Sequence, residues 1–248
     1  MQSLKTKPWQ ANIITLYPDM FPGYLNHSIL GKGLKKQIWS LKTYNPRDFA
    51  FDKHKTVDGT PAGGGAGMVM RPDIINEAIT KSIQEMSEGT SLPLIYLSPK
   101  GELFNQKTAQ GLAEGPGIAI ICGRFEGIDE RVIEKHQIKE LSLGDFILTG
   151  GEIAAQVLID ATVRLIPQIV GNKESILEES FSNGLLEYPH YTRPKYWKGN
   201  VIPQVLLSGN HGKIDEWRKK KAEEITRKRR PDLWEVYKKN GLVTDSDV

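Results

Sequence analysis

The stretch GIAIICGRFEG at residues 117–127 runs from six apolar or small residues directly into a turn bounded by two glycines. Continuous apolar runs of this length are typical of strands that are buried on both faces of a sheet. A second run, LPLIYL at residues 92–97, has the same character and leads into SPKG. Helix-like spacing of apolar residues marks Pro72–Met86 and Gly151–Ile166. This alternation predicts an α/β fold with a mostly parallel sheet.

The N-terminal part of the chain continues the same pattern. ANIITLY at residues 11–17 is expected to form the first strand, and a short helix is expected over Ser28–Lys36. IWSLKTY at residues 38–44 alternates as a strand does and stops at Asn45-Pro46. We therefore expect one domain built around this sheet over residues 1–170.

The remaining residues differ in composition and charge. Residues 171–185 are polar and acidic without a clear period, which predicts a linker, and residues 186–248 are expected to form a small, mainly helical domain. Residues 191–240 carry 14 of the 33 Lys and Arg but only 6 of the 30 Asp and Glu. A basic C-terminal domain beside a mildly acidic body indicates contact with nucleic acid.

Three glycine-bearing turns lie at or near predicted strand ends: Leu97–Gly101, Gly123–Gly127 and Leu143–Gly151. Ligands of open α/β sheets bind outside the carboxyl ends of the strands, and glycine lets the backbone approach a ligand closely. The chain has no GxxxxGK[ST] motif, and no GxGxxG opens a helix after the first strand. The turns therefore predict a backbone-lined pocket for a nucleoside that carries no phosphates.

Cysteine usage and hydropathy restrict the class of protein further. The single cysteine, Cys122, ends an apolar run and is expected to be a buried strand residue. This disfavours methylation of pyrimidine carbon 5, which usually needs a cysteine nucleophile. No stretch approaches the ~18 apolar residues of a membrane span, and the N-terminus does not resemble a signal peptide. A cytoplasmic protein is expected.

Long motifs in a fixed order resemble those of the bacterial tRNA (guanine-N1)-methyltransferases, which are knotted methyltransferases of the SPOUT class. They are CGRFEGIDERV at 122–132, SLGDFILTGGE at 142–152, YPHYTRP at 188–194, LLSGNH at 206–211, and YNPRDFAFDKHKTVDG at 44–59 with GGGAGM and IYLSPKG. The resemblance implies a deep trefoil knot and a homodimer with the active site at its interface. It implies S-adenosylmethionine as cofactor, magnesium as a possible further requirement, and methylation of guanosine 37 of tRNA, 3′ of the anticodon.

The resemblance also assigns residues to the cofactor, which they would contact mainly through their backbone. Leu143–Leu148 would surround the adenine, and Glu126 would face the charged end of the cofactor. The assigned residues are Tyr96, Leu97, Ser98, Pro99, Gly101, Gly123, Phe125, Glu126, Gly127, Ser142, Leu143, Gly144, Asp145, Phe146, Ile147, Leu148, Gly150 and Gly151. Substrate contacts are assigned to Asp129, His190, Tyr191, Arg193 and Lys195. Asp129 is explained equally well as a charge at a helix N-terminus.

Methylation of guanine N1 requires a base for the N1 proton and a positive group near O6. The family has its base, an aspartate, directly before Ser-Phe in the linker, where this chain has Glu179, with Glu178 as the alternative. The positive group implied is Arg164. Phosphate contacts are expected from Arg218–Lys221 and Arg227–Arg230.

The two tryptophans Trp197 and Trp217 are expected to pack into a small core rather than to stack on bases. Two other functions stay open on the sequence. One is a ribose 2′-O-methyltransferase of the same class, and the other is an RNA-binding module without catalysis whose glycine segments are only turns.

Overall fold

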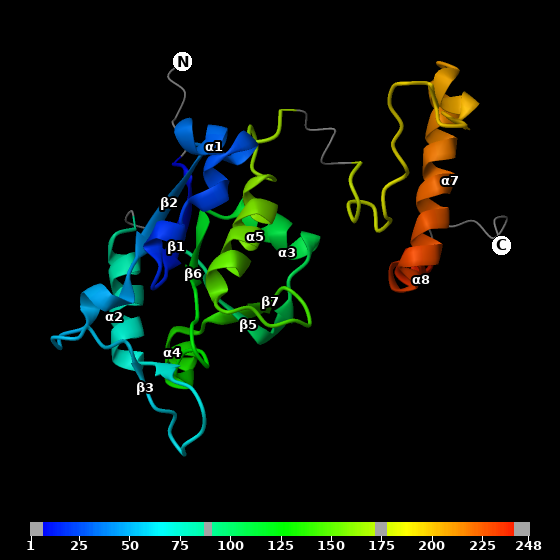
Figure 1. Cartoon of the computed structure of the whole chain (residues 1–248). Helices are drawn as coiled ribbons and strands as arrows, with labels where there is room; N and C mark the ends of the chain where they lie inside the picture. The colour runs from blue at the N-terminus through cyan, green and yellow to red at the C-terminus, as the bar shows by residue number, and fades with distance from the viewer. Residues whose placement is uncertain (1–6, 87–90, 172–177, 241–248) are drawn as a thin grey trace. The chain divides into compact units, whose positions relative to one another are not determined.

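The computed structural model describes residues 7–86, 91–171 and 178–240. By internal contacts the chain divides into two compact units, residues 1–171 and 172–248 (Figure 1). Residues 172–177, which belong to the predicted linker, lie outside the described residues.

A five-stranded sheet forms the centre of the first unit, and every neighbouring pair of its strands is parallel. The order across the sheet is β2 (Trp39–Tyr44), β1 (Trp9–Ile14), β6 (Gly117–Ile121), β5 (Leu94–Leu103) and β7 (Lys139–Ser142). The predicted α/β class with a parallel sheet is confirmed. A two-stranded antiparallel ribbon, β3 (Asp58–Gly59) with β4 (Val69–Met70), lies apart from this sheet.

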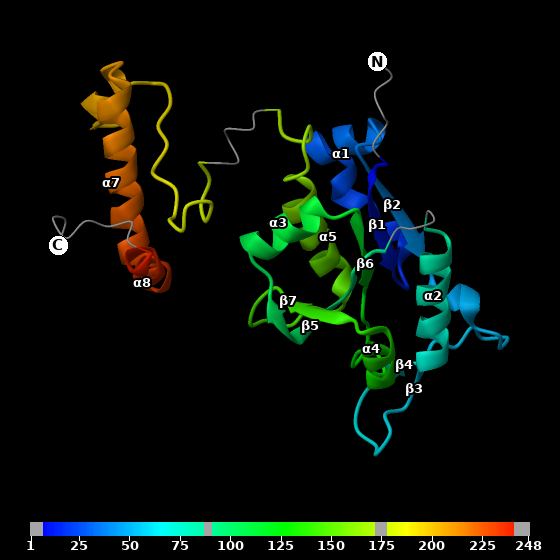
Figure 2. The same ribbon diagram turned by 180° about the vertical axis from the view of Figure 1, so that it is seen from behind.

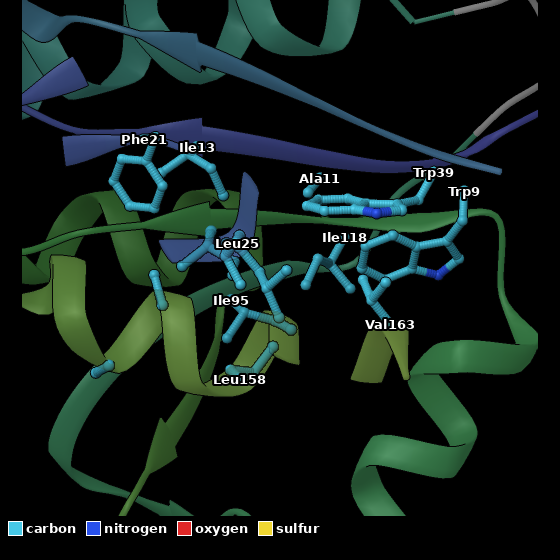
Figure 3. Close-up of a cluster of buried hydrophobic side chains, with 14 of the residues drawn as sticks. Trp9, Ala11, Ile13, Phe21, Leu25, Trp39, Ile95, Ile118, Leu158 and Val163 are labelled. Carbon is cyan, nitrogen blue, oxygen red and sulfur yellow. The ribbon is translucent and has the colours of Figure 1, made fainter. Parts of the chain in front are cut away.

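Helices cover both faces of the sheet, which explains the continuous apolar runs in its strands. The helices α1 (Ser28–Lys35), α3 (Gln106–Glu114) and α5 (Gly151–Val163) lie on one side, and α2 (Pro72–Gln84) and α4 (Glu130–His136) on the other (Figures 1 and 2). Successive strand residues alternate between the two cores: Ile13 and Ile120 pack with α5, whereas Ile14 and Ile121 pack with α2. Figure 3 shows the first core, where Trp9 and Trp39 lie near Ile118.

The predicted turn at Leu97–Gly101 is wrong as a strand end. Strand β5 continues to Leu103, and its pairing with β7 shifts register between Leu97 and Glu102. A Cβ on Gly101 would lie 2.4 Å from the backbone nitrogen of Leu141 in β7. The glycine therefore allows two backbones to approach each other inside the sheet, and the segment is a bulge rather than a turn.

The described residues of the second unit are a short hairpin followed by two helices. The hairpin pairs β8 (Tyr196–Trp197) with β9 (Asn200–Val201), and a 3-10 turn, η4 (Gln204–Leu207), leads to α7 (His211–Arg229) and α8 (Pro231–Lys239). Thr226 on α7 is buried, and its hydroxyl accepts a hydrogen bond from the Leu186 backbone at 2.8 Å. Within the described part of the chain, no helix is both long and apolar enough to cross a membrane.

Candidate functional site

A cavity of about 280 Å³ lies at the bulge of β5, at the carboxyl end of β7 and beside the turn that follows β6. Its lining comes from the three glycine-bearing segments, from the strand residues directly before two of them and from the start of α5: Tyr96, Leu97, Ser98, Pro99, Gly123, Arg124, Phe125, Glu126, Gly127, Leu141, Ser142, Leu143, Gly144, Phe146, Ile147, Leu148, Thr149, Gly150, Gly151 and Ala154. The volume is close to the lower end of the range for small-molecule sites, about 300 Å³. The structure thus brings together segments that are up to 50 residues apart in the chain.

Two of the residues assigned to the cofactor do not line this cavity. Gly101 lies inside the sheet against β7, as described above. Asp145 is exposed in the segment between β7 and α5, although its neighbours Gly144 and Phe146 are lining residues.

Tyr96, at the end of the regular part of β5, holds the Gly123–Gly127 turn in place. A Cβ on Gly123 would lie 2.7 Å from its ring, and one on Gly127 would lie 2.8 Å from its hydroxyl oxygen. Gly127 also has a φ of +118°, which favours glycine. The ring is almost completely buried, and this burial raises the pKa of Tyr96, so its hydroxyl stays protonated and neutral.

The glycine-rich run at residues 63–67 supports the same turn from the other side, and sequence reasoning missed this. The Glu126 backbone donates to the Met68 carbonyl at 2.9 Å, and the Met70 backbone donates to the Gly127 carbonyl at 2.9 Å. A Cβ on Gly67 would lie 2.5 Å from the Glu126 carboxylate. The repeated glycines of GGGAGM were the available signal, but their place in a family motif does not say which segment they contact.

Arg124 connects two of the lining segments, and it was also missed. Its guanidinium forms an ion pair with Glu152 at 2.8 Å, and it donates to the Thr149 carbonyl at 3.2 Å. The Glu152 carboxylate is buried and also accepts a hydrogen bond from the Thr15 hydroxyl at 2.9 Å. The Tyr17 ring lies 4.3 Å from the guanidinium carbon. The only visible signal was a charge of each sign inside the motifs GRFEG and GGE.

Arg124 is the one basic residue among those that line the cavity, and Glu152 neutralises it. A cation that is already engaged in this way is poorly placed to bind phosphates. The lining therefore offers backbone groups, apolar side chains such as Leu143 and Leu148, and the carboxylate of Glu126. This combination suits a nucleoside with a positively charged substituent.

Cys122 directly follows β6 and is completely buried, as predicted. Burial raises the pKa of the thiol well above its usual range, because a thiolate would lose its hydration there. The thiol is therefore suited to packing and not to nucleophilic attack.

Comparison with known proteins decides the family. A sequence model described as tRNA (Guanine-1)-methyltransferase TrmD matches residues 9–236. The chain belongs to this family. Among its relatives, the tRNA (guanine-N(1)-)-methyltransferase of Ruegeria pomeroyi is 58% identical over 229 residues, which are 92% of this chain and 93% of the relative. The enzyme of Bartonella bacilliformis is 55% identical over 236 residues, 95% and 99% of the two chains, and that of Rhodospirillum rubrum is 52% identical over 228 residues, 92% and 93%.

The two residues that the sequence assigned to catalysis in this TrmD family member lie in different units. Arg164 caps the carboxyl end of α5 and is half-buried, and its backbone donates to the Asp160 carbonyl at 3.2 Å. Glu179 is half-buried in the second unit, where it helps to line a cavity of about 610 Å³. The neighbouring Glu178 accepts a hydrogen bond from the Tyr188 hydroxyl at 3.1 Å and lies 4.0 Å from the Arg218 guanidinium.

Asp129 has a clear structural task in this TrmD family member. It is the N-cap of α4 and accepts a hydrogen bond from the Arg131 backbone at 3.0 Å, and its two carboxylate oxygens accept from the Arg131 side chain at 2.8 and 2.7 Å. These hydrogen bonds lower the pKa of Asp129 and keep it ionised at neutral pH.

The residues of the second unit that the sequence assigned to the substrate line one cavity together with residues of the hairpin. His190 contacts the Glu187 carboxylate, and Tyr191 packs against Trp217 with 6.2 Å between ring centroids. Arg193 and Lys195 are exposed. Trp217 is half-buried, but Trp197 is 60% exposed, so the prediction that it packs into a core is wrong. The reason is that β8 and β9 form an isolated two-stranded ribbon, with no further strand in their sheet.

Proposed function

We propose that this chain methylates N1 of guanosine 37 in tRNA, 3′ of the anticodon, with S-adenosylmethionine bound in the cavity between the glycine-bearing segments. Membership of the TrmD family makes the chain a tRNA (guanine-N1)-methyltransferase. Family membership also disfavours the two other functions considered, ribose 2′-O methylation and RNA binding without catalysis. A tRNA substrate implies action in the cytoplasm.

The composition of the cavity lining is the observation that carries the cofactor assignment. Glycine backbone from Gly123–Gly127 and Gly144–Gly151 can meet adenine and ribose closely, and apolar residues such as Leu148 can cover the ring. The single basic group, Arg124, is neutralised by Glu152, so the lining suits adenosine without phosphates. Glu126 offers a carboxylate to the positive end of the cofactor.

We also propose that the segment from Ser142 to Gly151 is threaded to form the trefoil knot of the SPOUT class. Its last residue crosses the turn after β6 closely: the Gly151 backbone donates to the Gly123 carbonyl at 3.0 Å. A Cβ on Gly151 would lie 2.9 Å from the Cα of Cys122. Such a crossing of two backbones is what a threaded loop requires, and only glycine permits it here.

A homodimer with an active site completed by the partner is part of the proposal. Apolar side chains on the cavity segment and on α5 are exposed in the single chain: Ile147 by 79%, Phe146 and Ile153 each by 53%, and Val157 by 44%. Burial of these side chains against a second copy would remove them from water, which favours association.

The reaction divides between a proton acceptor and a positive group. Bound S-adenosylmethionine supplies the methyl group from its sulfonium, so that the N1–methyl bond forms as the sulfur–methyl bond breaks. Glu179 accepts the proton that leaves guanine N1, and Arg164 stabilises the negative charge that develops on O6. Glu178 is the alternative base, and its carboxylate accepts a hydrogen bond from the Tyr188 hydroxyl and lies 4.0 Å from the Arg218 guanidinium.

Magnesium is not assigned to any residue. No group of three or more His, Cys, Asp or Glu side chains that could hold a metal ion occurs in the part of the chain that the structure describes.

Two measurements test the proposal. Titration calorimetry should detect binding of S-adenosylmethionine to the purified protein, and an absence of binding contradicts the cofactor assignment. Transcripts of one tRNA with G or A at position 37 should then be incubated with the protein and labelled cofactor, and digested for mass spectrometry. We expect 1-methylguanosine only from the G37 transcript. Equal labelling of both transcripts, or a label on ribose, would overturn the site assignment.

A further inference from the structure

The hairpin of the second unit is built to hold its side chains in fixed positions. Its two-residue turn consists of Lys198 and Gly199, with φ values of +48° and +84°. Positive φ at both central residues is the signature of a type I′ turn, whose twist matches that of the flanking strands. Trp197 stands directly opposite Asn200 in the ribbon. A backbone bond from Ile202 to the Lys195 carbonyl at 3.2 Å extends the pairing by one step.

This hairpin exposes large aromatic side chains to solvent. Tyr196 is 65% exposed and Trp197 is 60% exposed, although tryptophan is usually highly buried. Trp197 is one of the residues that line a cavity of about 520 Å³, and Tyr191, Arg193, Lys195 and Asn200 also line it. Tyr196 does not line this cavity. An apolar ring is thus presented at the edge of a hollow that a planar ligand can enter.

The charged residues that line this cavity are basic, and one carboxylate, that of Glu187, contacts the lining residue His190. Residues 188–214 contain no Asp or Glu, whereas they contain Arg193, Lys195, Lys198 and Lys213. The Lys198 ammonium lies 5.4 Å from the centroid of the Trp197 ring. No acidic residue lines the cavity. Exposed aromatic rings among uncompensated cations are the combination with which proteins bind unpaired nucleotides, because the rings stack on bases and the cations face phosphates.

We propose that the cavity at the β8–β9 hairpin receives one unstacked nucleotide of the RNA substrate, with its base on Trp197 and its phosphates facing Arg193 and Lys195. The site is additional to the cofactor cavity of the first unit. It rests on the proposed function insofar as the RNA is a tRNA. A protein partner is disfavoured. Such a partner would have to supply acidic residues to balance Arg193, Lys195 and Lys198, and an apolar partner surface would leave these cations unpaired.

The test compares three substitutions at the hairpin. Dissociation constants for a labelled tRNA transcript with G37 should be measured by fluorescence anisotropy for the wild type, Trp197→Ala, Trp197→Phe and Tyr196→Ala, over a series of salt concentrations. Stacking on one base is worth roughly 1–3 kcal/mol, so Trp197→Ala should weaken binding about 5- to 150-fold. Trp197→Phe should recover most of the affinity, and Tyr196→Ala should change it about twofold or less, since Tyr196 lies outside the cavity.

Salt dependence separates stacking from charge. Trp197→Ala should leave the slope of log affinity against log salt unchanged, whereas Arg193→Gln should reduce it by about one. The affinity for S-adenosylmethionine should be the same in all these variants. An affinity of Trp197→Ala for the transcript equal to that of the wild type would overturn the inference while leaving the methyltransferase assignment intact. A wild-type protein that does not bind tRNA would overturn both.

Fluorescence gives an independent readout at the same site. Stacking of a base on Trp197 should quench part of the protein's tryptophan emission when tRNA saturates the protein, and Trp197→Phe should lack that part of the quenching. If the quenching is the same in Trp197→Phe and in the wild type, no base lies on this ring, and the inference is wrong.

Discussion

At the scale of single residues, Arg124 and Glu152 hold the cofactor cavity together. Arg124 stands in one lining segment and Glu152 follows directly after another, and their ion pair at 2.8 Å is completed by the Thr15 hydroxyl and the Thr149 carbonyl. The Gly150 backbone lies directly against the guanidinium, where a Cβ would be 2.4 Å from its Nε. The spacing of GRFEG and GGE in the chain contains no information that these two charges meet.

Arg124→Ala should lower the free energy of unfolding by about 3 kcal/mol, because it leaves the buried Glu152 carboxylate without its partner. It should also weaken binding of S-adenosylmethionine. Urea denaturation and calorimetry measure the two effects. Arg131→Ala is the control, since the Arg131 side chain is 76% exposed and its loss should cost about 1 kcal/mol or less.

A double variant makes this prediction stricter. Arg124→Ala combined with Glu152→Ala removes both charges, so it should be less destabilised than the sum of the two single variants. Strict additivity of the three changes in unfolding free energy would show that the two residues are not coupled.

Glu179→Gln should reduce the rate of methyl transfer at saturating substrate by about 100-fold or more, because the N1 proton loses its acceptor. The affinity for S-adenosylmethionine should stay unchanged. Glu178→Gln is the matched control, since it removes the neighbouring carboxylate, and we expect it to keep most of the activity. Single-turnover rates measured with a G37 transcript decide between them, and the opposite pattern would assign the base to Glu178.

At the scale of elements, the bulge in β5 places the first lining segment at the cavity. Residues 94–97 pair with β6 or β7 as a regular strand does, and pairing with β7 resumes at Glu102. Ser98 and Pro99 lie within the interruption and line the cavity. The local sequence LSPKG predicts a turn, since proline and glycine favour one. Strand β7 extends the pairing instead, and it lies more than 30 residues further along the chain.

Gly101→Ala should lower the free energy of unfolding by about 1–3 kcal/mol, because the added Cβ would collide with the backbone of Leu141. Gly111→Ala is a matched control within α3, where nothing lies within 4 Å of the added Cβ. That substitution should stabilise the protein by about 0.5–1 kcal/mol, since alanine is the better helix former. Chemical denaturation of both variants gives the comparison, and equal effects would show that the close approach to β7 is unimportant.

At the scale of the whole molecule, the two units differ in the surfaces that they offer to ligands. The first unit has a cavity that is lined largely by backbone, and its one basic lining residue is neutralised by an ion pair. The second unit has cations along α7 and around the hairpin. The cations of α7 are not equivalent. Arg227, Lys228 and Arg229 are exposed, whereas Arg230 donates to the Asp232 carboxylate at 2.8 Å. The first three are therefore better placed for phosphate contacts than Arg230.

Replacement of Arg227, Lys228 and Arg229 by Gln should weaken tRNA binding and reduce the salt slope by about one for each phosphate contact that is lost. Arg230→Gln should change the slope much less, because its guanidinium is already paired. Anisotropy titrations over a salt series measure both. A steep slope retained in the triple variant would place this end of α7 outside the RNA-binding surface.

Local patterns in the sequence determined the class of fold and most of its elements. Apolar periodicity depends only on near neighbours, so α2, β2 and β6 were predicted within two residues of their observed bounds. The glycine-bearing segments after β6 and before α5 were also identified, because glycine at a strand end indicates close approach of backbone.

Only the tertiary structure decided which residues meet across the chain. The continuation of β5 through a bulge, the contact of Gly67 with Glu126 and the pairing of Arg124 with Glu152 all join segments that are distant in sequence. The exposure of Trp197 depends on the β8–β9 ribbon having only two strands among the residues that the structure describes. Each of these features results from packing between segments, and a pattern that repeats over two to four residues contains no information about it.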